Sequence, residues 1–222
     1  MVWQSSFAIQ YPEYDKEGEL IHEATNQSVV NVARYYYYET VQVYSTDDDI
    51  RNNGCIEGHE SLRRKIGCLH RDISIGNLMI NEDDGNLSWP SFLIDLDLAA
   101  REQRDGASGA KGMTGTRAFM AIRALLGEQH SFMHDLESFF WVLFWICIHY
   151  KGPGESRAVS RFDRWNYVDT EELAGMKLGV VADEPLIPLL NRLRKIVFPQ
   201  GKPWNGDDEK LYSQMREFLR KG

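Results

Sequence analysis

The stretch HRDISIGNLM (residues 70–79) is the densest run of chemically capable side chains in this chain of 222 residues. It follows residues 54–69, whose apolar positions share one helical face, and its end overlaps a short apolar run at residues 78–80. The sequence therefore predicts a loop between a helix and a strand, with Asp72 and Asn77 five positions apart on that loop.

A second short apolar run, at residues 92–94, is followed at once by Asp95. The intervening residues 81–86 (NEDDGN) are of the types that form turns, so the two runs predict a β-hairpin. Because hairpin strands are antiparallel, the end of the second strand returns to the start of the first. We therefore expect Asp95 to lie beside Asn77.

Asp72, Asn77 and Asp95 together suit phosphoryl transfer, in which a protein mainly positions the reactants and neutralises charge. A carboxylate is needed to orient the acceptor hydroxyl and take its proton, and Asp72 is suited to this role. Magnesium prefers oxygen ligands, which Asn77 and Asp95 supply.

Two further motifs follow along the chain. The first is GTRAFMA at residues 115–121, and the second is HDLESFF at residues 134–140. The second motif opens a predicted helix over residues 134–150, which is apolar on all sides through its middle. A helix without a polar face is expected at the centre of a domain.

In this order and spacing, the motifs resemble those of protein kinases, and more narrowly those of the fungal-type protein kinase family. HRD-x-x-x-x-N and the D-x-D-x-A of residues 95–99 resemble the catalytic loop and the metal loop. GTRAFMA resembles the end of the activation segment, and HDLESFF resembles the start of the central helix of the C-lobe. The resemblance extends from about residue 3 to the C-terminus and is densest over residues 70–150.

The resemblance implies an α+β, protein-kinase-like fold with a small, incomplete, β-rich N-lobe and a mainly helical C-lobe. The N-lobe part would occupy residues 1–53 and the C-lobe residues 54–222. It also implies an ATP-dependent protein serine/threonine kinase that uses ATP and Mg²⁺ and acts on a protein substrate.

Roles at the reaction centre follow from the same resemblance. Asp72 would be the catalytic base, Asn77 a magnesium ligand, and Asp95 the main magnesium ligand that bridges the nucleotide phosphates. Glu17 would be the N-lobe helix glutamate that pairs with a nucleotide-binding lysine.

Four other residues would shape or regulate the site. His70 and Arg71 would form the catalytic loop, and Arg71 would receive an activating phosphate on a residue such as Thr116. Asp135 would brace the loop from the central helix.

The nucleotide-binding part departs from the family pattern. The only lysine in the first 64 residues is Lys16, directly beside Glu17, and Gln4 stands where the family has its lysine. The segment between Glu17 and Asp72 is short for a kinase hinge, and Arg123 stands where kinases have a glutamate after Ala-Pro. These differences predict a kinase fold that binds ATP weakly and turns over slowly.

Two other functions remain open at this point. One is a pseudokinase or fragment that acts as a binding module through its C-lobe helices. The other is a small-molecule kinase of the aminoglycoside or choline type, because that class also has a His-x-Asp-x-x-x-x-Asn loop and an Ile-Asp strand end.

The composition indicates which binding partners and which cellular location are expected. Lysine and arginine number 25 and aspartate and glutamate 33, so the formal net charge is −8 and nucleic acid is not an expected partner. The longest apolar run, residues 139–148, is half of the roughly 20 residues that a membrane span requires. With three cysteines and neither a signal peptide nor a zinc-ligand spacing, the chain is expected to be intracellular, cytoplasmic or nuclear.

Overall fold

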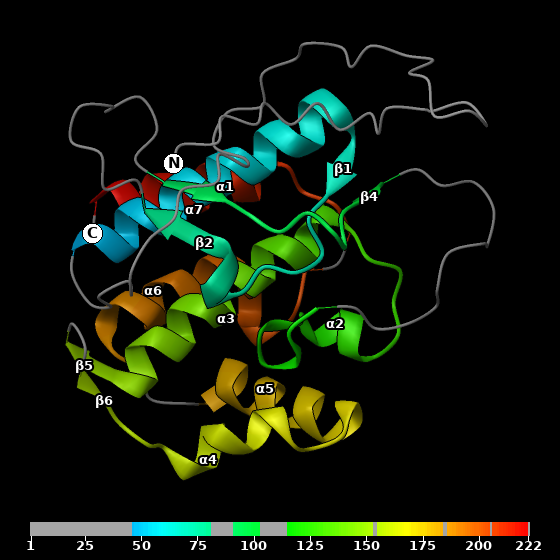
Figure 1. Ribbon diagram of the computed structural model, residues 1–222. Coiled ribbons are helices and arrows are strands. Elements are labelled where there is room, and N and C mark those ends of the chain that lie inside the picture. Colours follow the sequence, from blue (N-terminus) through cyan, green and yellow to red (C-terminus); the bar gives the residue numbers. More distant parts are fainter. Residues whose placement is uncertain are drawn as a thin grey trace, which may run out of the picture.

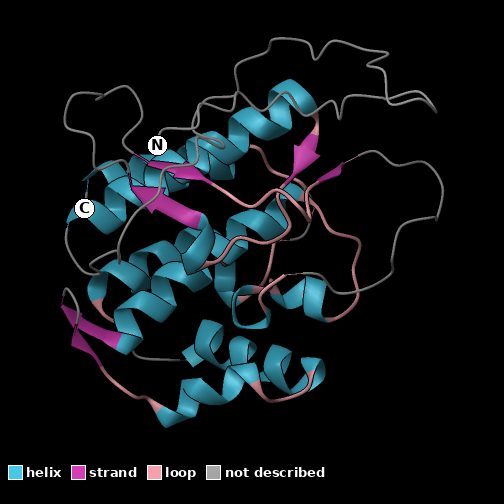
Figure 2. Cartoon of the chain, in the orientation of Figure 1, coloured by secondary structure: helices cyan, strands magenta, loops and turns pink. Residues whose placement is uncertain are grey.

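The computed structural model describes residues 46–80, 91–102, 115–152, 155–183, 186–204 and 206–221. Helices dominate these residues, and the strands are short (Figure 2). The helices are α1 (Thr46–Ile66), α2 (Ile122–Leu125), α3 (Phe132–His149), α4 (Ser160–Asp163), α5 (Thr170–Asp183), α6 (Pro188–Val197) and α7 (Lys210–Lys221). Single 3₁₀ turns are η1 (Ile75–Asn77), η2 (Arg117–Phe119), η3 (Arg164–Asn166) and η4 (Pro199–Gly201).

The described strands form three antiparallel pairs. They are β1 (Cys68–Leu69) with β4 (Ala100–Arg101), β2 (Leu78–Ile80) with β3 (Ser91–Leu93), and β5 (Tyr150–Gly152) with β6 (Glu155–Ser156). This mixed architecture, with little β-structure and many helices, confirms the expected α+β class.

Helix α3 forms the centre of the molecule, as its lack of a polar face predicts. Its residues 139–142 are completely buried. In Figure 1, α3 runs between α1 and α7 on one side and α4 and α5 on the other, and it contacts α1, α2 and α6. The apolar surface that α3 buries against these helices is the main source of stability here.

The predicted hairpin is confirmed. Leu78 pairs with Leu93 and Ile80 with Ser91, so the end of β3 lies beside the start of β2. Helix α1, which precedes the loop of residues 70–77, starts at Thr46 and so begins before the helical face predicted over residues 54–69. Three consecutive aspartates at residues 47–49 account for this start, since negative charge favours the N-terminal end of a helix.

The expected strands and helix of the N-terminal region lie in residues 1–45, outside the described residues, and Glu17 is among them. The predicted boundary between the lobes, at residues 53 and 54, falls inside α1. Among the described helices, none combines the length and the apolar character needed to cross a bilayer.

The starts of two C-terminal helices have local causes. Asp169 caps α5, because its Oδ1 accepts the Glu172 backbone N–H at 2.8 Å. Helix α6 begins at Pro188. Proline in the first helical turn has no backbone hydrogen bond to lose, so Pro188 is a favourable start.

Candidate active site

The catalytic loop between β1 and η1 is held in place by one carboxylate of α3. Asp135 is 1% exposed, and it accepts the backbone N–H of His70 at 3.0 Å and that of Arg71 at 3.1 Å. Arg71 has a φ of +69°, a left-handed conformation that non-glycine residues seldom adopt. The contact expected between Asp135 and the loop is therefore present, and it holds a strained backbone.

Two histidines complete the surroundings of Asp135. His59 of α1 lies 2.7 Å from Oδ2 through its Nε2, and His130 lies 2.7 Å from Oδ1 through its Nε2. Burial alone would raise the pKa of Asp135, but the charge and hydrogen bond of His130, with those of His59, hold it well below its usual value. Asp135 is therefore an ionised acceptor at the base of the loop.

His70 joins the catalytic loop to the end of β3. Its Nε2 lies 2.9 Å from the Ile94 carbonyl oxygen, and the Asp72 backbone N–H lies 3.3 Å from its Nδ1. Burial lowers the pKa of His70, which favours the neutral ring. A neutral ring can donate to Ile94 and accept from Asp72, so His70 fixes both segments at once.

The Asp72 carboxylate is oriented by a segment that comes more than forty residues later. Thr116 donates to Asp72 Oδ1 from its backbone N at 2.8 Å and from its hydroxyl at 3.0 Å. Asn77 Nδ2 lies 3.3 Å from Asp72 Oδ2 and 2.9 Å from the Asp72 backbone oxygen. Asp72 and Asn77 therefore lie side by side on the loop.

Gly115 allows this close approach. Its φ is +107°, and a Cβ there would lie 2.7 Å from the Arg71 backbone oxygen. A side chain at this position would therefore separate the two segments. Because the Thr116 hydroxyl already contacts the Asp72 carboxylate, a phosphate on Thr116 would also meet that carboxylate, and like charges repel.

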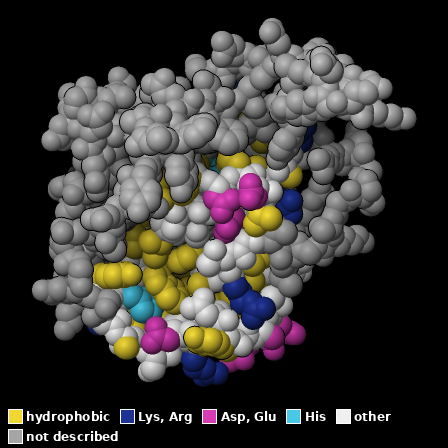
Figure 3. Space-filling view, in the orientation of Figure 1, with side chains coloured by type: hydrophobic (Ala, Val, Ile, Leu, Met, Phe, Trp, Pro, Cys, Tyr) yellow, Lys and Arg dark blue, Asp and Glu magenta, His cyan; other side chains and the backbone are white. Residues whose placement is uncertain are grey.

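Asp95 follows directly from the hairpin. The Ile94 backbone N–H donates to the Asn77 carbonyl oxygen at 3.0 Å, which brings the end of β3 to the catalytic loop. Asp95 itself is exposed and has a φ of +59°, so this carboxylate too is presented by a left-handed backbone. Figure 3 shows acidic side chains gathered near the centre of the face on which this loop lies.

The donor set fits a magnesium ion that shares its coordination with a nucleotide. Asn77 directs its Nδ2 to Asp72, which leaves Oδ1 as an oxygen donor, and Asp95 adds a carboxylate. The described residues contain no cluster of three or more His, Cys, Asp or Glu that would enclose a metal. Magnesium does not require one, because it commonly takes one or two protein oxygens plus water and substrate phosphates.

The histidine partners of Asp135 were not predicted. The sequence shows His130 without a regular spacing to a carboxylate, although the structure places it against Asp135. His59 lies 76 positions from Asp135 in the chain, and no periodic pattern links them. The buried residues Glu137 and Lys177 were also missed, since charged residues are expected at the surface.

Comparison with known families agrees with this geometry. Residues 52–147 match the model of the fungal protein kinase family. This stretch, which is less than half of the chain, is similar to a fungal protein kinase family domain. The matched part of that domain includes the catalytic loop, Asp95, Thr116 and Asp135. No curated protein matches the chain.

Proposed function

We propose that the chain transfers the γ-phosphate of ATP to a serine or threonine hydroxyl of a protein substrate. The observation that supports this best is the convergence of Asp72, Asn77 and the chain leading to Asp95. Asn77 Nδ2 lies 3.3 Å from Asp72 Oδ2, and the Ile94 backbone N–H donates to the Asn77 carbonyl oxygen at 3.0 Å. The carboxylate that would orient the hydroxyl therefore lies beside Asn77 and the chain that enters Asp95. The fungal protein kinase match supports the same general chemistry.

In this mechanism, Asp72 accepts a hydrogen bond from the acceptor hydroxyl and takes its proton as the oxygen attacks the γ-phosphorus, while the bond from that phosphorus to the β-phosphate oxygen breaks and ADP leaves. The two Thr116 donors occupy Oδ1 and fix the plane of the carboxylate. Asn77 and Asp95 would hold Mg²⁺, which neutralises the charge of the phosphates when bound.

The position of residues 115–122, called the acceptor segment below, favours a protein acceptor over a small alcohol. This segment runs from Thr116, against Asp72, through η2 to the first residue of α2. Thr116 and Arg117 are exposed there. An extended peptide could therefore lie along exposed chain next to the carboxylate that receives its hydroxyl.

A pseudokinase that serves as a binding module is the second candidate. The observation in its favour is in the sequence, where Gln4 stands in place of the lysine that grips the nucleotide phosphates in the family. Glutamine has no positive charge for the phosphates. The proposal therefore includes weak ATP binding and slow turnover.

The test is transfer of radiolabelled γ-phosphate from Mg-ATP to casein, with choline and an aminoglycoside as alternative acceptors. We expect labelled casein, and we expect Asp72→Asn to reduce the rate by about 10²- to 10⁴-fold, the usual contribution of a general base. Asp207→Asn changes an exposed aspartate outside the site and serves as the matched control.

Each other outcome contradicts the proposal in a defined way. Labelling of choline or the aminoglycoside but not casein would assign the chain to the small-molecule kinases. A folded protein that transfers nothing and binds no fluorescent ATP analogue would be the binding module.

A further inference from the structure

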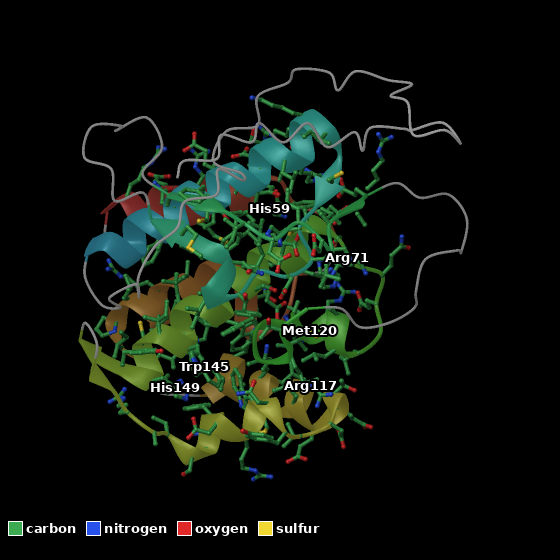
Figure 4. The ribbon with its side chains drawn as sticks, in the orientation of Figure 1. His59, Arg71, Arg117, Met120, Trp145 and His149 are labelled. Atoms are coloured by element: carbon green, nitrogen blue, oxygen red, sulfur yellow. The ribbon has the colours of Figure 1, made fainter. Side chains whose placement is uncertain are left out.

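Two buried charged residues hold the end of the acceptor segment. Lys177 of α5 donates through Nζ to the Met120 carbonyl oxygen, and Glu137 of α3 accepts the Ile122 backbone N–H at 2.7 Å. These two backbone groups flank Ala121. In Figure 4, Met120 lies between the loop that carries Arg71 and the helices below it.

Both side chains lie deep in the molecule. Lys177 is 0% exposed and Glu137 is 7% exposed. The Lys177 ammonium lies 4.5 Å from the ring centroid of Trp141 and 5.3 Å from that of Trp165, and the Trp141 indole N–H donates to Glu137 at 2.9 Å. A charged group is costly to bury, so each charge here depends on the other and on its hydrogen bonds.

The electrostatics agree with this mutual dependence. Burial lowers the pKa of Lys177, and the charge of Glu137 opposes that change. Burial raises the pKa of Glu137, and its hydrogen bonds from Ile122 and Trp141 and the charge of Lys177 oppose that change.

A purely apolar core at this place would be easier to stabilise. Replacing buried charges by well-packed apolar groups is often neutral or stabilising in other proteins. The specific property that Lys177 and Glu137 add is a fixed position for Met120 and Ile122. The other end of the same segment is where Thr116 holds Asp72.

We propose that Lys177 and Glu137 are positioning residues, which fix the acceptor segment so that Thr116 can orient Asp72 for the incoming hydroxyl. This inference rests on the proposed function for its consequence in transfer, but the immobilisation itself can be measured without activity. Helices α3 and α5 thus act on Asp72 through the five residues of chain that separate Thr116 from Ile122.

The first experiment is amide hydrogen exchange of the full chain, read on peptides that cover residues 115–125. In Lys177→Met, we expect the amides of the acceptor segment to exchange about tenfold faster or more, which is the usual effect of losing a hydrogen bond to a charged group. Peptides from α3 and α7 should be unchanged. Lys195→Met, which alters an exposed lysine on α6, is the matched control.

A second variant distinguishes loss of this contact from general unfolding of the protein. In Lys177→Met the Glu137 charge is left unpaired, whereas the double variant Lys177→Met/Glu137→Gln removes both charges and keeps an oxygen for Ile122 and Trp141. We expect this variant to regain thermal stability and still show fast exchange in the acceptor segment. Exchange equal to wild type in a stably folded double variant would overturn the proposal.

Transfer kinetics separate this inference from the proposed function. We expect the double variant to lower kcat with casein about fivefold or more while the KM for ATP is unchanged, because Asp72 is less well oriented toward the attacking hydroxyl. A kcat equal to that of wild type, together with a lower free energy of unfolding, would mean that the pair serves stability alone. If wild type transfers no phosphate, the proposed function fails, and the exchange data alone decide on Lys177 and Glu137.

Discussion

Individual residues at this site are held by partners that are distant in the chain. Asp72 is the clearest case, since its carboxylate plane depends on the two donors of Thr116. A carboxylate that must take a proton needs a defined direction, because a misaligned base is a poor hydrogen-bond acceptor for the attacking hydroxyl. At this scale, the Thr116 hydroxyl is the most easily tested contact.

Thr116→Val should reduce transfer to casein by about tenfold or more, since a hydrogen bond to an ionised group is lost while the backbone N–H contact stays. Thr116→Ser keeps the hydroxyl and should retain most of the rate. Initial rates at saturating ATP measure the effect. Equal rates for the valine and serine variants would show that the hydroxyl does not orient Asp72.

At the scale of one element, the start of α3 is stabilised by a neutral histidine. His134 Nδ1 accepts the Ser131 backbone N–H at 2.9 Å and lies 3.1 Å from the Ser131 hydroxyl, as in a capping box. Its Nε2 is buried and has no hydrogen-bond partner among the described residues. Burial first, and then the neighbouring charge of His130, lower the pKa of His134 to about 4.

The stability of the chain should therefore depend on pH through His134. Because the folded-state pKa is below the ordinary value of about 6.5, the unfolded chain binds more protons between these limits. The contribution of His134 to the free energy of unfolding is fully present above pH 6.5. It is lost as the pH is lowered toward 4, by at most about 1.4 kcal/mol per pH unit. His70, whose pKa is also lowered, adds to the slope.

His134→Gln tests this account, since glutamine keeps an acceptor for Ser131 and does not titrate. Urea denaturation at several pH values should give a smaller slope below pH 6.5 than wild type and a similar free energy of unfolding at neutral pH. His134→Ala also removes the titration but should lose about 1 kcal/mol at neutral pH with the cap. A slope equal to that of wild type in both variants would contradict the role of His134.

At the scale of the whole molecule, one buried chain of side chains joins three helices to the catalytic loop. His59 of α1 lies 2.6 Å from the Tyr212 hydroxyl of α7 through Nδ1 and 2.7 Å from Asp135 of α3 through Nε2. Figure 1 shows α7 alongside α1, and the Arg216 ion pairs with Glu57 and Glu60 join the same two helices. The last helix therefore supports the site without touching it.

Tyr212→Phe should lower the free energy of unfolding by about 1–3 kcal/mol, because it leaves a buried ring nitrogen of His59 without its partner. Tyr167→Phe, at a residue that is 85% exposed, should have little effect and is the matched control. Chemical denaturation at neutral pH compares the two. No difference between the variants would mean that His59 is satisfied in another way.

Local signals in the sequence determined the elements and the candidate site residues. The apolar runs on either side of a turn predicted the hairpin, and the unbroken apolar middle of residues 134–150 predicted the central helix, because periodicity and turn chemistry act over a few neighbours. The spacing of Asp72, Asn77 and Asp95 likewise predicted the core of the site. The first turns of α1, residues 46–53, lie outside the helical face predicted over residues 54–69, since acidic residues suit both loops and helix N-termini.

Only the tertiary structure decided how these residues are held. Thr116 meets Asp72 across 44 positions, Lys177 meets Met120 across 57, and His70 meets Asp135 across 65. Contacts of this kind produce no repeating pattern in the sequence. Each one depends on how the helices pack and on which polar groups come within hydrogen-bond distance. The sequence thus determined which groups can perform the chemistry, and packing determined which of them are buried, oriented and kept neutral or charged.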